Sequence, residues 1–372
     1  MVLYNQNMKI AIVHDYLNQR GGAERVVDAI SNIFPDAPIY TSIYFPDDTF
    51  PGFKNKDIRT SFMQNFPFIR RHFKKYFFIY PFAFKRFNFD EYDVVISSSS
   101  AYASGIDTGP NTLHICYCHT PARFLYMYDE YVKREKYDLL VKFLLPYFIA
   151  RLKKWDIDNS INVNYFIANS SAVSERIKKY YGRKSDVIYP PIETQKYKQS
   201  DSAGNYFLVV SRLATYKRLD LAIKAFTRLK FPLKVVGTGP DLADLKKMSS
   251  SNIEFLSAVS DNSLLELYRD AKALVFPGLE DFGITPLEAQ ASGIPVIAYG
   301  EGGALETVVD GKTGVFFHEQ TPEALVEAVN KFNSVRFDKK FIKSHADIFD
   351  FEIFKNKLLR FINKKYEEFI KK

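Results

Sequence analysis

The stretch PGLEDFGITPLEAQASGIPVIAYGEGGALET, residues 277–307, decides the fold of the second half of the chain. It begins at the end of the apolar run KALVFPG, which is typical of a buried strand. It continues through the helix-like TPLEAQAS into a second apolar run, IPVIAYG. A strand, a helix and a strand in this order predict a crossover between parallel strands, so we expect an α/β domain around this segment.

The same alternation extends over both halves of the chain. In the first half the strand-like MKIAIVHDYL is followed by Gly21, Gly22 and the helical pattern AERVVDAISNIF. Further strands are expected in YDVVISSSS, TLHICYCH and NYFIANSS, and a long helix over residues 132–155. A segment rich in proline, serine and polar residues spans residues 186–205, and the pattern restarts at YFLVVSRL. Later runs predict the strands PLKVVG, NIEFL and TGVFFH.

This organisation predicts two Rossmann-like, doubly wound α/β domains that face each other across a cleft. The predicted domains are residues 1–190 and residues 191–349, with a helix over residues 350–372 that can pack back on the first domain. The length of 372 residues also favours two domains, because single hydrophobic cores usually stop growing at about 250–300 residues. We expect ligands where strand carboxyl ends and helix N-termini converge.

The composition is typical of a folded protein of the cytoplasm. The chain is 47% hydrophobic and 25% charged, and no apolar run approaches the ~20 residues that span a bilayer. The N-terminal residues do not have the pattern of a secretory signal. Cys116 and Cys118 are the only cysteines, which fits a reducing compartment, and their spacing predicts two small buried side chains rather than a metal site.

Glu280 is the strongest candidate for a functional carboxylate. It follows the strand KALVFPG at its carboxyl end, where functional residues gather in α/β folds. The backbone amides of Phe282, Gly283, Ile284 and Thr285 precede a predicted helix, and such amides attract anions. A diphosphate on these amides would leave Glu280 to accept hydrogen bonds from sugar hydroxyls.

Glu288 has two interpretations. Thr285, Pro286 and Glu288 match a capping box, in which the glutamate is a structural cap. If the side chain leaves that role, it could reach a ribose.

Two further motifs favour an anionic ligand. Arg212 and Lys217 in SRLATYKR follow the first strand of the second domain, at a spacing that lets both converge on one phosphate group. Either residue alone would more often be a solvated surface charge. Gly237 and Gly239 in VVGTGP form a lone G-x-G, which a plain tight turn explains equally well.

At this point the residues resemble a known family. SRLATYKR, VVGTGP, EDFGITPLEAQASGIPVIA and GGALETVVDGKTG resemble the donor-binding half of the retaining glycosyltransferase family 4, which has the two-domain GT-B fold. HDYLNQRGGAERV and YCHTPARFLY resemble the mannosyltransferases of O-antigen and other bacterial surface polysaccharides within that family.

The resemblance implies a role for each matching residue. Arg212 and Lys217 would bind the donor diphosphate, and Gly22, next to Gly21, would let the first helix approach the phosphates. Glu280 would contact the donor sugar and Glu288 the ribose. His119 would lie beside the transferred sugar, although a histidine hydrogen-bonded at a strand end is the alternative. The loop SAVSD, which contains Val259, would line the base, but it has Ser257 where many relatives carry glycine.

The resemblance also implies the reaction: transfer of a hexose, with mannose from GDP-mannose as the expected donor, to a lipid-linked or oligosaccharide acceptor. No metal or other cofactor is expected, because cationic side chains and helix N-termini would offset the diphosphate charge. A UDP-sugar-dependent transferase is the alternative within the family. A nicotinamide dehydrogenase is disfavoured, because HDYLNQRGGAER lacks G-x-G-x-x-G after the first strand.

One segment carries an unusual composition. Residues 58–89 contain seven basic residues and no acidic residue, and twelve aromatic residues lie in residues 62–89. Basic and aromatic side chains together favour an anionic membrane surface, so we expect a peripheral protein on the inner face of the cytoplasmic membrane. The contact is predicted through Arg70, Arg71, Lys74 and Lys75. The alternatives are aromatic rings packed in the domain core, or a nucleic-acid-binding surface, which the anionic cleft makes the weaker hypothesis.

Overall fold

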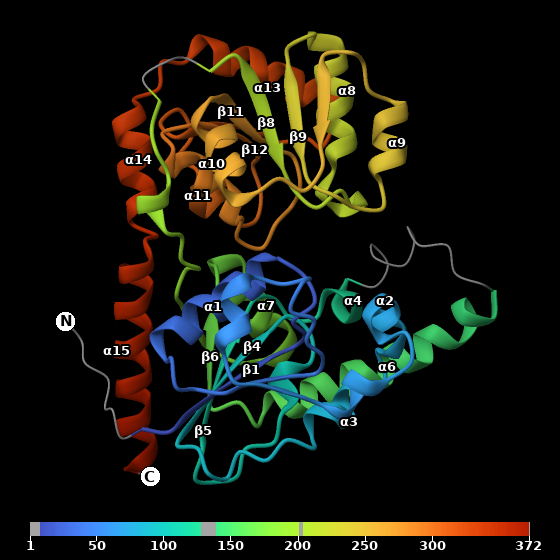
Figure 1. Ribbon diagram of the computed structural model, residues 1–372, viewed down its shortest axis with the longest axis vertical. Coiled ribbons are helices and arrows are strands. Elements are labelled where there is room, and N and C mark those ends of the chain that lie inside the picture. Colours follow the sequence, from blue (N-terminus) through green and yellow to red (C-terminus); the bar gives the residue numbers. More distant parts are fainter. Residues whose placement is uncertain (1–7, 128–138, 201–203, 372) are drawn as a thin grey trace. The chain divides into compact units, whose positions relative to one another are not determined.

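The computed structural model describes residues 8–127, 139–200 and 204–371 (Figure 1). The chain divides into two compact units. Unit 1 comprises Met1–Tyr189 together with Phe354–Lys372, and unit 2 comprises Pro190–Ile353. The division falls one residue from the predicted boundary at 190/191, and the last helix belongs to unit 1 for most of its length.

Unit 1 is built on a seven-stranded sheet in the order β3-β2-β1-β4-β5-β6-β7. All its described strand pairs are parallel, as predicted for a doubly wound α/β fold. The central strands β1, β4 and β5 are buried along their whole length, which explains their continuous apolar runs. The strands are β1 (Ile10–His14), β2 (Ile39–Thr41), β3 (Ile58–Thr60), β4 (Val94–Ser99), β5 (Leu113–Cys118), β6 (Tyr165–Ala168) and β7 (Ser185–Val187).

Helices cover this sheet through apolar faces. Helix α1 buries Val26, Val27 and Ile30. Helix α15 buries its own apolar residues, which are Phe354, Leu358, Leu359 and Ile362. The ring of Phe354 lies 6.1 Å from that of Tyr117 on β5, which anchors the C-terminal helix on unit 1. The helices are α1 (Gly22–Ile33), α2 (Ile69–His72), α3 (Tyr80–Phe84), α4 (Arg123–Tyr126), α6 (Leu139–Ser160), α7 (Ser171–Tyr181) and α15 (Phe351–Ile370).

Unit 2 repeats the architecture with six parallel strands in the order β10-β9-β8-β11-β12-β13. One hydrophobic core lies between this sheet and helices α8 and α13, and the ring of Phe207 contacts those of Phe226 and Phe332. The strands are β8 (Tyr206–Val210), β9 (Leu233–Val236), β10 (Ile253–Leu256), β11 (Ala271–Phe276), β12 (Val296–Tyr299) and β13 (Gly314–Phe317). The helices are α8 (Leu219–Leu229), α9 (Leu242–Lys247), α10 (Asp261–Arg269), α11 (Ile284–Ala291), α12 (Ala304–Thr307), α13 (Pro322–Ser334) and α14 (Lys339–Asp347).

The predicted elements of both units are largely confirmed. Each apolar run read as a strand forms one, and the final segment forms the amphipathic helix α15. The three-residue strands β2, β3 and β7 and the helix α14 were not expected from the sequence. Helix α6 occupies part of the predicted helix over residues 132–155, of which residues 132–138 lie outside the described chain.

A buried carboxyl group ties three helices of unit 1 together. Asp156 on α6 is 3% exposed, and its Oδ2 accepts hydrogen bonds of 2.8 Å from the hydroxyls of Tyr126 on α4 and Tyr181 on α7. Burial raises the pKa of Asp156 to about 7, with a further increase from Asp15, although the two tyrosine hydroxyls act in the opposite direction. The protonated form of Asp156 is therefore favoured in the folded protein below about pH 7.

This pKa predicts how the stability of unit 1 depends on pH. Because the pKa is higher in the folded than in the unfolded chain, the contribution of Asp156 is complete below about pH 4 and is lost as pH rises through about 7. The loss is on the order of 4 kcal/mol for a shift of about three units. Asp156→Asn should therefore flatten the fall in stability between pH 4 and pH 7.

The measurement is urea unfolding followed by the fluorescence of Trp155, the single tryptophan, which lies next to Asp156 and reports on unit 1. The matched control is Asp158→Asn, two residues along α6, where the carboxylate is exposed and pairs with Lys154. The control should keep the wild-type pH dependence. An unchanged pH dependence in Asp156→Asn would contradict the assignment.

Candidate functional site

In each sheet the strand order reverses at one point, and loops from two neighbouring strands diverge there. In unit 2 the reversal lies between β8 and β11, because β9 and β10 continue on one side and β12 and β13 on the other. In open α/β sheets this position, at the strand carboxyl ends, is where ligands bind. The loop after β8 carries Arg212 and Lys217, and the loop after β11 carries Glu280.

The structure brings two of these predicted residues into contact. The Nζ of Lys217 forms an ion pair with Oε1 of Glu280, and both side chains are mostly buried, at 20% and 15% exposure. An ammonium group has three donors and a carboxylate has several acceptor positions, so the pair keeps capacity for further partners. One side chain can still donate to a phosphate oxygen, and the other can still accept from hydroxyl groups. Their contact with a ligand stays a prediction.

Glycines hold the Glu280 loop in place. The amide of Gly303 donates to the carbonyl oxygen of Glu280 at 2.9 Å. A Cβ atom at Gly303 would overlap the backbone of Phe282, so only glycine allows this close approach. The GG pair of GGALET therefore supports the loop that carries Glu280.

The predicted capping box is wrong. Helix α11 begins at Ile284 with Gly283 as N-cap in a left-handed conformation (φ 88°), and Thr285 lies inside the helix. Pro286 does not delay the start, because the first four amides of a helix have no intrahelical partner. Glu288 is 2% exposed and its Oε2 accepts a 2.7 Å hydrogen bond from Tyr268 on α10. The alternative, a ribose contact by Glu288, stays a prediction.

Arg212 differs from Lys217 in its surroundings. It is exposed, and it forms no ion pair with any residue in the described part of the chain. The G-x-G motif packs beneath it: a Cβ at Gly237 or Gly239 would overlap the carbonyl of Ser211 or Leu213, and Gly237 has φ 136°. The two glycines thus shape the Arg212 loop. Val259 lies in the loop after the edge strand β10, where Ser260 caps α10.

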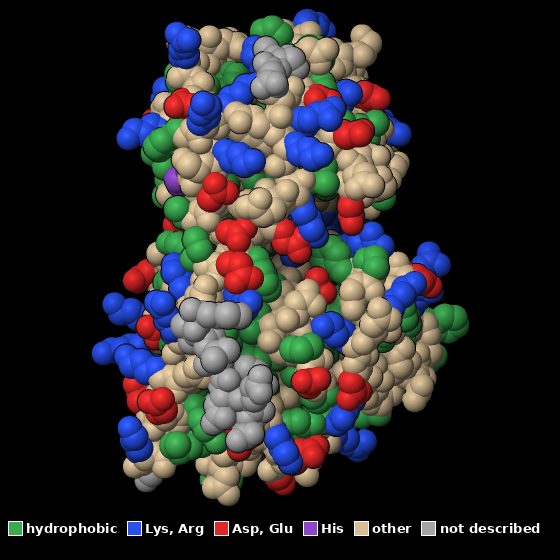
Figure 2. All heavy atoms as spheres, turned by 60° about the vertical axis from the view of Figure 1, so that its left-hand side comes forward, with side chains coloured by type: hydrophobic (Ala, Val, Ile, Leu, Met, Phe, Trp, Pro, Cys, Tyr) green, Lys and Arg blue, Asp and Glu red, His purple; other side chains and the backbone are tan. Residues whose placement is uncertain are grey.

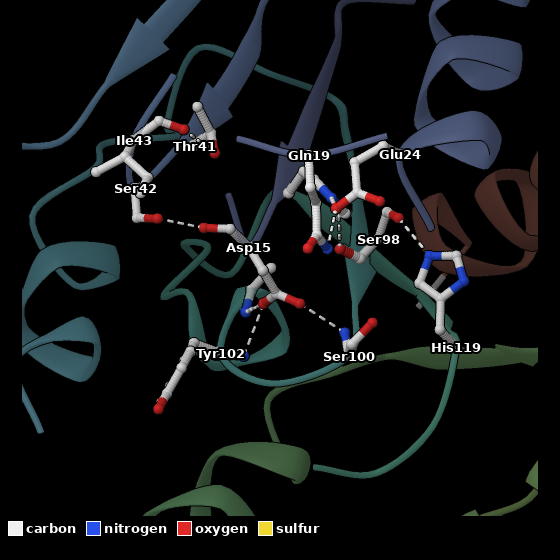
Figure 3. Close-up of polar contacts among 12 residues, drawn as sticks. Asp15, Gln19, Glu24, Thr41, Ser42, Ile43, Ser98, Ser100, Tyr102 and His119 are labelled. Carbon is white, nitrogen blue, oxygen red and sulfur yellow. Dashed lines mark hydrogen bonds and ion pairs between the residues drawn. The ribbon is translucent and has the colours of Figure 1, made fainter. Parts of the chain in front are cut away.

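In unit 1 the predicted residue His119 follows β5 directly and is 7% exposed. Its Nε2 lies 2.7 Å from Oγ of Ser98, at the end of the neighbouring strand β4 (Figure 3). Sequence reasoning missed Ser98, although four consecutive serines at a strand end were a signal that hydroxyl groups gather there. The hydrogen bond fixes the orientation of the imidazole. It also fits the alternative of a structural histidine.

The loop that precedes α1 lies at the reversal of strand order in unit 1. Gly21 is the N-cap of α1 and Gly22 its first residue. Asp15, which sequence reasoning also missed, accepts from the amide of Ser100 at 2.6 Å and from the amides of Tyr102 and Ala103 at 2.7 Å (Figure 3). A single carboxylate thereby joins the loops after β1 and β4.

The basic and aromatic segment is less of a surface than predicted. Many of its rings, including Tyr80, Phe84 and Phe89, are buried in the core of unit 1. Arg70 is held by Asp48 through two hydrogen bonds of 2.8 Å, so its charge is already paired. Three rings of the segment are exposed: Phe68 (80% exposed), Phe78 (46%) and Phe82 (66%). The predicted contact residues Arg71, Lys74 and Lys75 are exposed too, as are Lys85 and Arg86.

Other predicted features can be placed. Cys116 and Cys118 form no disulfide within the described residues and are buried in an apolar cluster, as expected. Within the described residues, no group of three or more histidine, cysteine or acidic side chains is arranged to hold a metal ion, and no helix is long and apolar enough to span a membrane. On the face drawn in Figure 2, lysine and arginine side chains are scattered among acidic ones and form no continuous basic strip.

Comparison with known proteins matches both units to sequence families. Residues 20–196 match the family model described as Glycosyltransferase Family 4, and residues 192–344 match Glycosyl transferases group 1. The chain is similar to the alpha-1,3/1,6-mannosyltransferase ALG2 of Dictyostelium discoideum, with 25% identity covering 89% of this chain and 91% of that protein.

A second relative and a solved structure extend this similarity. The GDP-mannose-dependent alpha-(1-6)-phosphatidylinositol monomannoside mannosyltransferase of Mycolicibacterium smegmatis is 33% identical over 50% of this chain and 56% of that protein. The fold is similar to that of HepE from Anabaena, solved in complex with UDP, with a TM-score of 0.71 and 16% identity over 96% of this chain and all of that one.

The exposed, unpaired Arg212 generates a prediction about anion binding. Arg212→Ala should weaken the binding of inorganic pyrophosphate about ten- to a hundredfold, the scale of one charge-assisted hydrogen bond. Isothermal titration measures the change. Arg336→Ala, which removes an exposed arginine from another part of unit 2, is the control and should bind like the wild type. Equal affinity in Arg212→Ala would place the anion site elsewhere.

Proposed function

The chain belongs to glycosyltransferase family 4 and is a glycosyltransferase, and we propose that it transfers mannose from GDP-mannose to a lipid-linked or oligosaccharide acceptor of a surface polysaccharide such as O-antigen. The observation that carries the proposal is the Lys217–Glu280 ion pair at the strand-order reversal of unit 2. A cation can bind phosphate and a carboxylate can accept from hydroxyl groups, so this pair has the chemistry that a nucleotide sugar requires.

The choice of donor is supported by the relatives. One similar protein is named a GDP-mannose-dependent mannosyltransferase, and another a mannosyltransferase. The alternative is a UDP-sugar donor, which the UDP complex of the structural neighbour HepE keeps open. Both donors share the diphosphate and the hexose, so both use the same charged pair.

In the proposed reaction the sugar is transferred with retention of the anomeric configuration. The bond between the anomeric carbon and the phosphate oxygen breaks while the acceptor oxygen bonds to the same face of that carbon. The departing phosphate oxygen takes the acceptor proton, so no protein nucleophile is required. Arg212, Lys217 and the amides at the start of α11 offset the charge on the departing diphosphate, and no metal or other cofactor takes part.

His119 is proposed to lie beside the transferred sugar. Its ring is oriented by Ser98, and its carbonyl oxygen accepts from Asn169 at 2.9 Å, so backbone and side chain are both held. Such anchoring is what a group that contacts a reacting sugar needs, because small displacements are costly in catalysis. Glu288 and Val259 are proposed to contact the ribose and the base.

A donor screen tests the proposal. Purified enzyme is supplied with a membrane extract as acceptor and with GDP-mannose, UDP-glucose or UDP-galactose, and released nucleoside diphosphate is measured. GDP-mannose should give the highest rate. Release only from UDP-sugars would select the alternative, and release from none of the three sugars would reject the proposed transfer.

The role of Glu280 predicts the behaviour of one variant. Glu280→Gln keeps the shape of the side chain but loses the charge that accepts from sugar hydroxyls, so turnover should fall by about 10²-fold, the scale of one preorganised polar contact. The released diphosphate is again the readout. Glu301→Gln, an exposed neighbour in the loop after β12, serves as control and should keep normal turnover. Near wild-type turnover in a folded Glu280→Gln protein would reject the assignment.

We also propose that the enzyme is peripheral on the inner face of the cytoplasmic membrane, where a lipid-linked acceptor is presented. The support is the exposed set of Phe68, Phe78 and Phe82 with the cations Arg71, Lys74 and Lys75. Arg70 is left out of this set because Asp48 holds it. Each exposed cation near an anionic surface contributes ~1 kcal/mol, and the rings add apolar contact.

The membrane proposal predicts a selective loss. The triple variant Arg71→Glu, Lys74→Glu and Lys75→Glu should no longer sediment with phosphatidylglycerol vesicles, because attraction becomes repulsion. Its release of nucleoside diphosphate with a water-soluble acceptor should be unchanged. A control with the same charge change in unit 2, Lys246→Glu, Lys247→Glu and Arg336→Glu, should still sediment. Retained sedimentation by the first variant at the same salt concentration would reject this surface.

A further inference from the structure

The strand-order reversal of unit 1 contains two buried ionisable side chains that the proposed mechanism does not use. His14 is the last residue of β1 and Glu24 lies in the first turn of α1, and each is 1% exposed. The loops after β1 and β4 diverge at this point, which is the location in an open α/β sheet where ligands bind. Asp15 is next to them, but its carboxylate is occupied by backbone amides (Figure 3).

His14 has a buried ring nitrogen without a hydrogen-bond partner. Its Nδ1 lies 2.9 Å from the carbonyl oxygen of Ser98, which can only accept, so Nδ1 carries a proton. Burial lowers the pKa of His14, but Glu24, Asp15 and the Ser98 carbonyl together outweigh burial and raise it. When the ring is protonated, both nitrogens are donors. Nε2 nevertheless makes no hydrogen bond, because its nearest acidic oxygen, Oε1 of Glu24, is 3.7 Å away.

Glu24 has a buried carboxylate oxygen without a hydrogen-bond partner. Its Oε1 accepts a 2.9 Å hydrogen bond from Gln19, whereas its buried Oε2 has no partner (Figure 3). A third buried atom without a partner, Oδ1 of Asn18, lies in the same loop. Buried polar groups are nearly always hydrogen-bonded in folded proteins, so a donor and an acceptor left open together indicate a missing polar occupant.

We propose that His14 and Glu24 bind a sugar hydroxyl group of the substrate. A sugar hydroxyl can accept from Nε2 of protonated His14 and at the same time donate to Oε2 of Glu24. Gly21 lies beside Oε2 of Glu24, and a Cβ atom at this position would overlap that oxygen. Every larger residue at this position would close the approach, so glycine keeps it open.

The position of Ser98 connects this pair to the proposed reaction. The carbonyl oxygen of Ser98 accepts from His14, and the hydroxyl of the same residue bonds His119. A hydroxyl held by His14 is therefore linked through one residue to the imidazole proposed to lie beside the transferred sugar. The inference rests on the proposed function. The hydroxyl belongs either to the donor hexose or to the acceptor sugar, and the experiment separates the two.

The test is nuclear magnetic resonance of the full chain labelled with ¹⁵N-histidine, with the His14 signal assigned from His14→Gln. Three probes are titrated separately: GDP-mannose, GDP and methyl α-D-mannopyranoside. The Nε2 resonance of His14 should shift with GDP-mannose if the hydroxyl is the donor's, with the methyl glycoside if it is the acceptor's, and with GDP in neither case. No shift with either sugar at saturation would overturn the proposal.

A variant adds a quantitative arm. Glu24→Gln should weaken the binding of the sugar probe that shifts His14 by about ten- to a hundredfold, while the affinity for GDP stays unchanged. Asp28→Asn, one turn further along α1, is the matched control and should bind both probes like the wild type. Unchanged sugar affinity in Glu24→Gln, or an equal loss for GDP, would contradict the proposal, the latter because it indicates a general structural defect.

Failure of the inference can be told from failure of the proposed function. If no nucleotide sugar binds the wild-type protein and none is turned over in the donor screen, the proposed function is wrong and the inference falls with it. If GDP-mannose binds and is turned over but neither sugar affects His14, only the inference is wrong. The labelled wild-type protein gives this answer even if Glu24→Gln fails to fold.

Discussion

The structure depends on one constraint: parallel strands can be joined only by crossovers, so all strand carboxyl ends lie along one edge of each sheet. Wherever the strand order reverses, the loops of two adjacent strands leave in opposite directions and open a space between them. In unit 2 that space receives Lys217 and Glu280, and in unit 1 it receives His14, Glu24 and the Asp15 anchor. The same geometry, used twice, sets polar side chains at equivalent positions.

This constraint explains why much of the fold and part of the candidate site could be predicted from sequence. A long buried run such as VFPG marks a strand and its end, and residues just beyond it, such as Glu280 and His119, belong to the carboxyl edge. The short strands β2, β3 and β7 were not predicted, because three residues are too few to show an apolar pattern. The cap at Glu288 was mistaken because Gly283, and not Thr285, accepts the left-handed turn that starts α11.

What could not be predicted depends on partners distant in sequence. Asp15 binds amides 85 to 88 residues away, and Ser98 meets His119 across 21 residues. The composition of residues 62–89 was misleading for a related reason. Its rings were counted together, but whether a ring faces the core or the solvent depends on residues elsewhere, such as Tyr40 and Tyr102. The burial of a ring depends on the whole folded unit, so a count of aromatic residues in one segment does not predict it.

The path of the chain has a consequence for how the protein is made. Unit 1 is discontinuous, because it needs α15 from the end of the sequence to cover Tyr117 and Tyr165, whereas unit 2 is a single continuous segment. During synthesis, α15 is made only after the whole of unit 2. Unit 1 leaves the apolar surface for α15 uncovered until that helix has been made, so it begins first but cannot be completed before the segment of unit 2 has been synthesised.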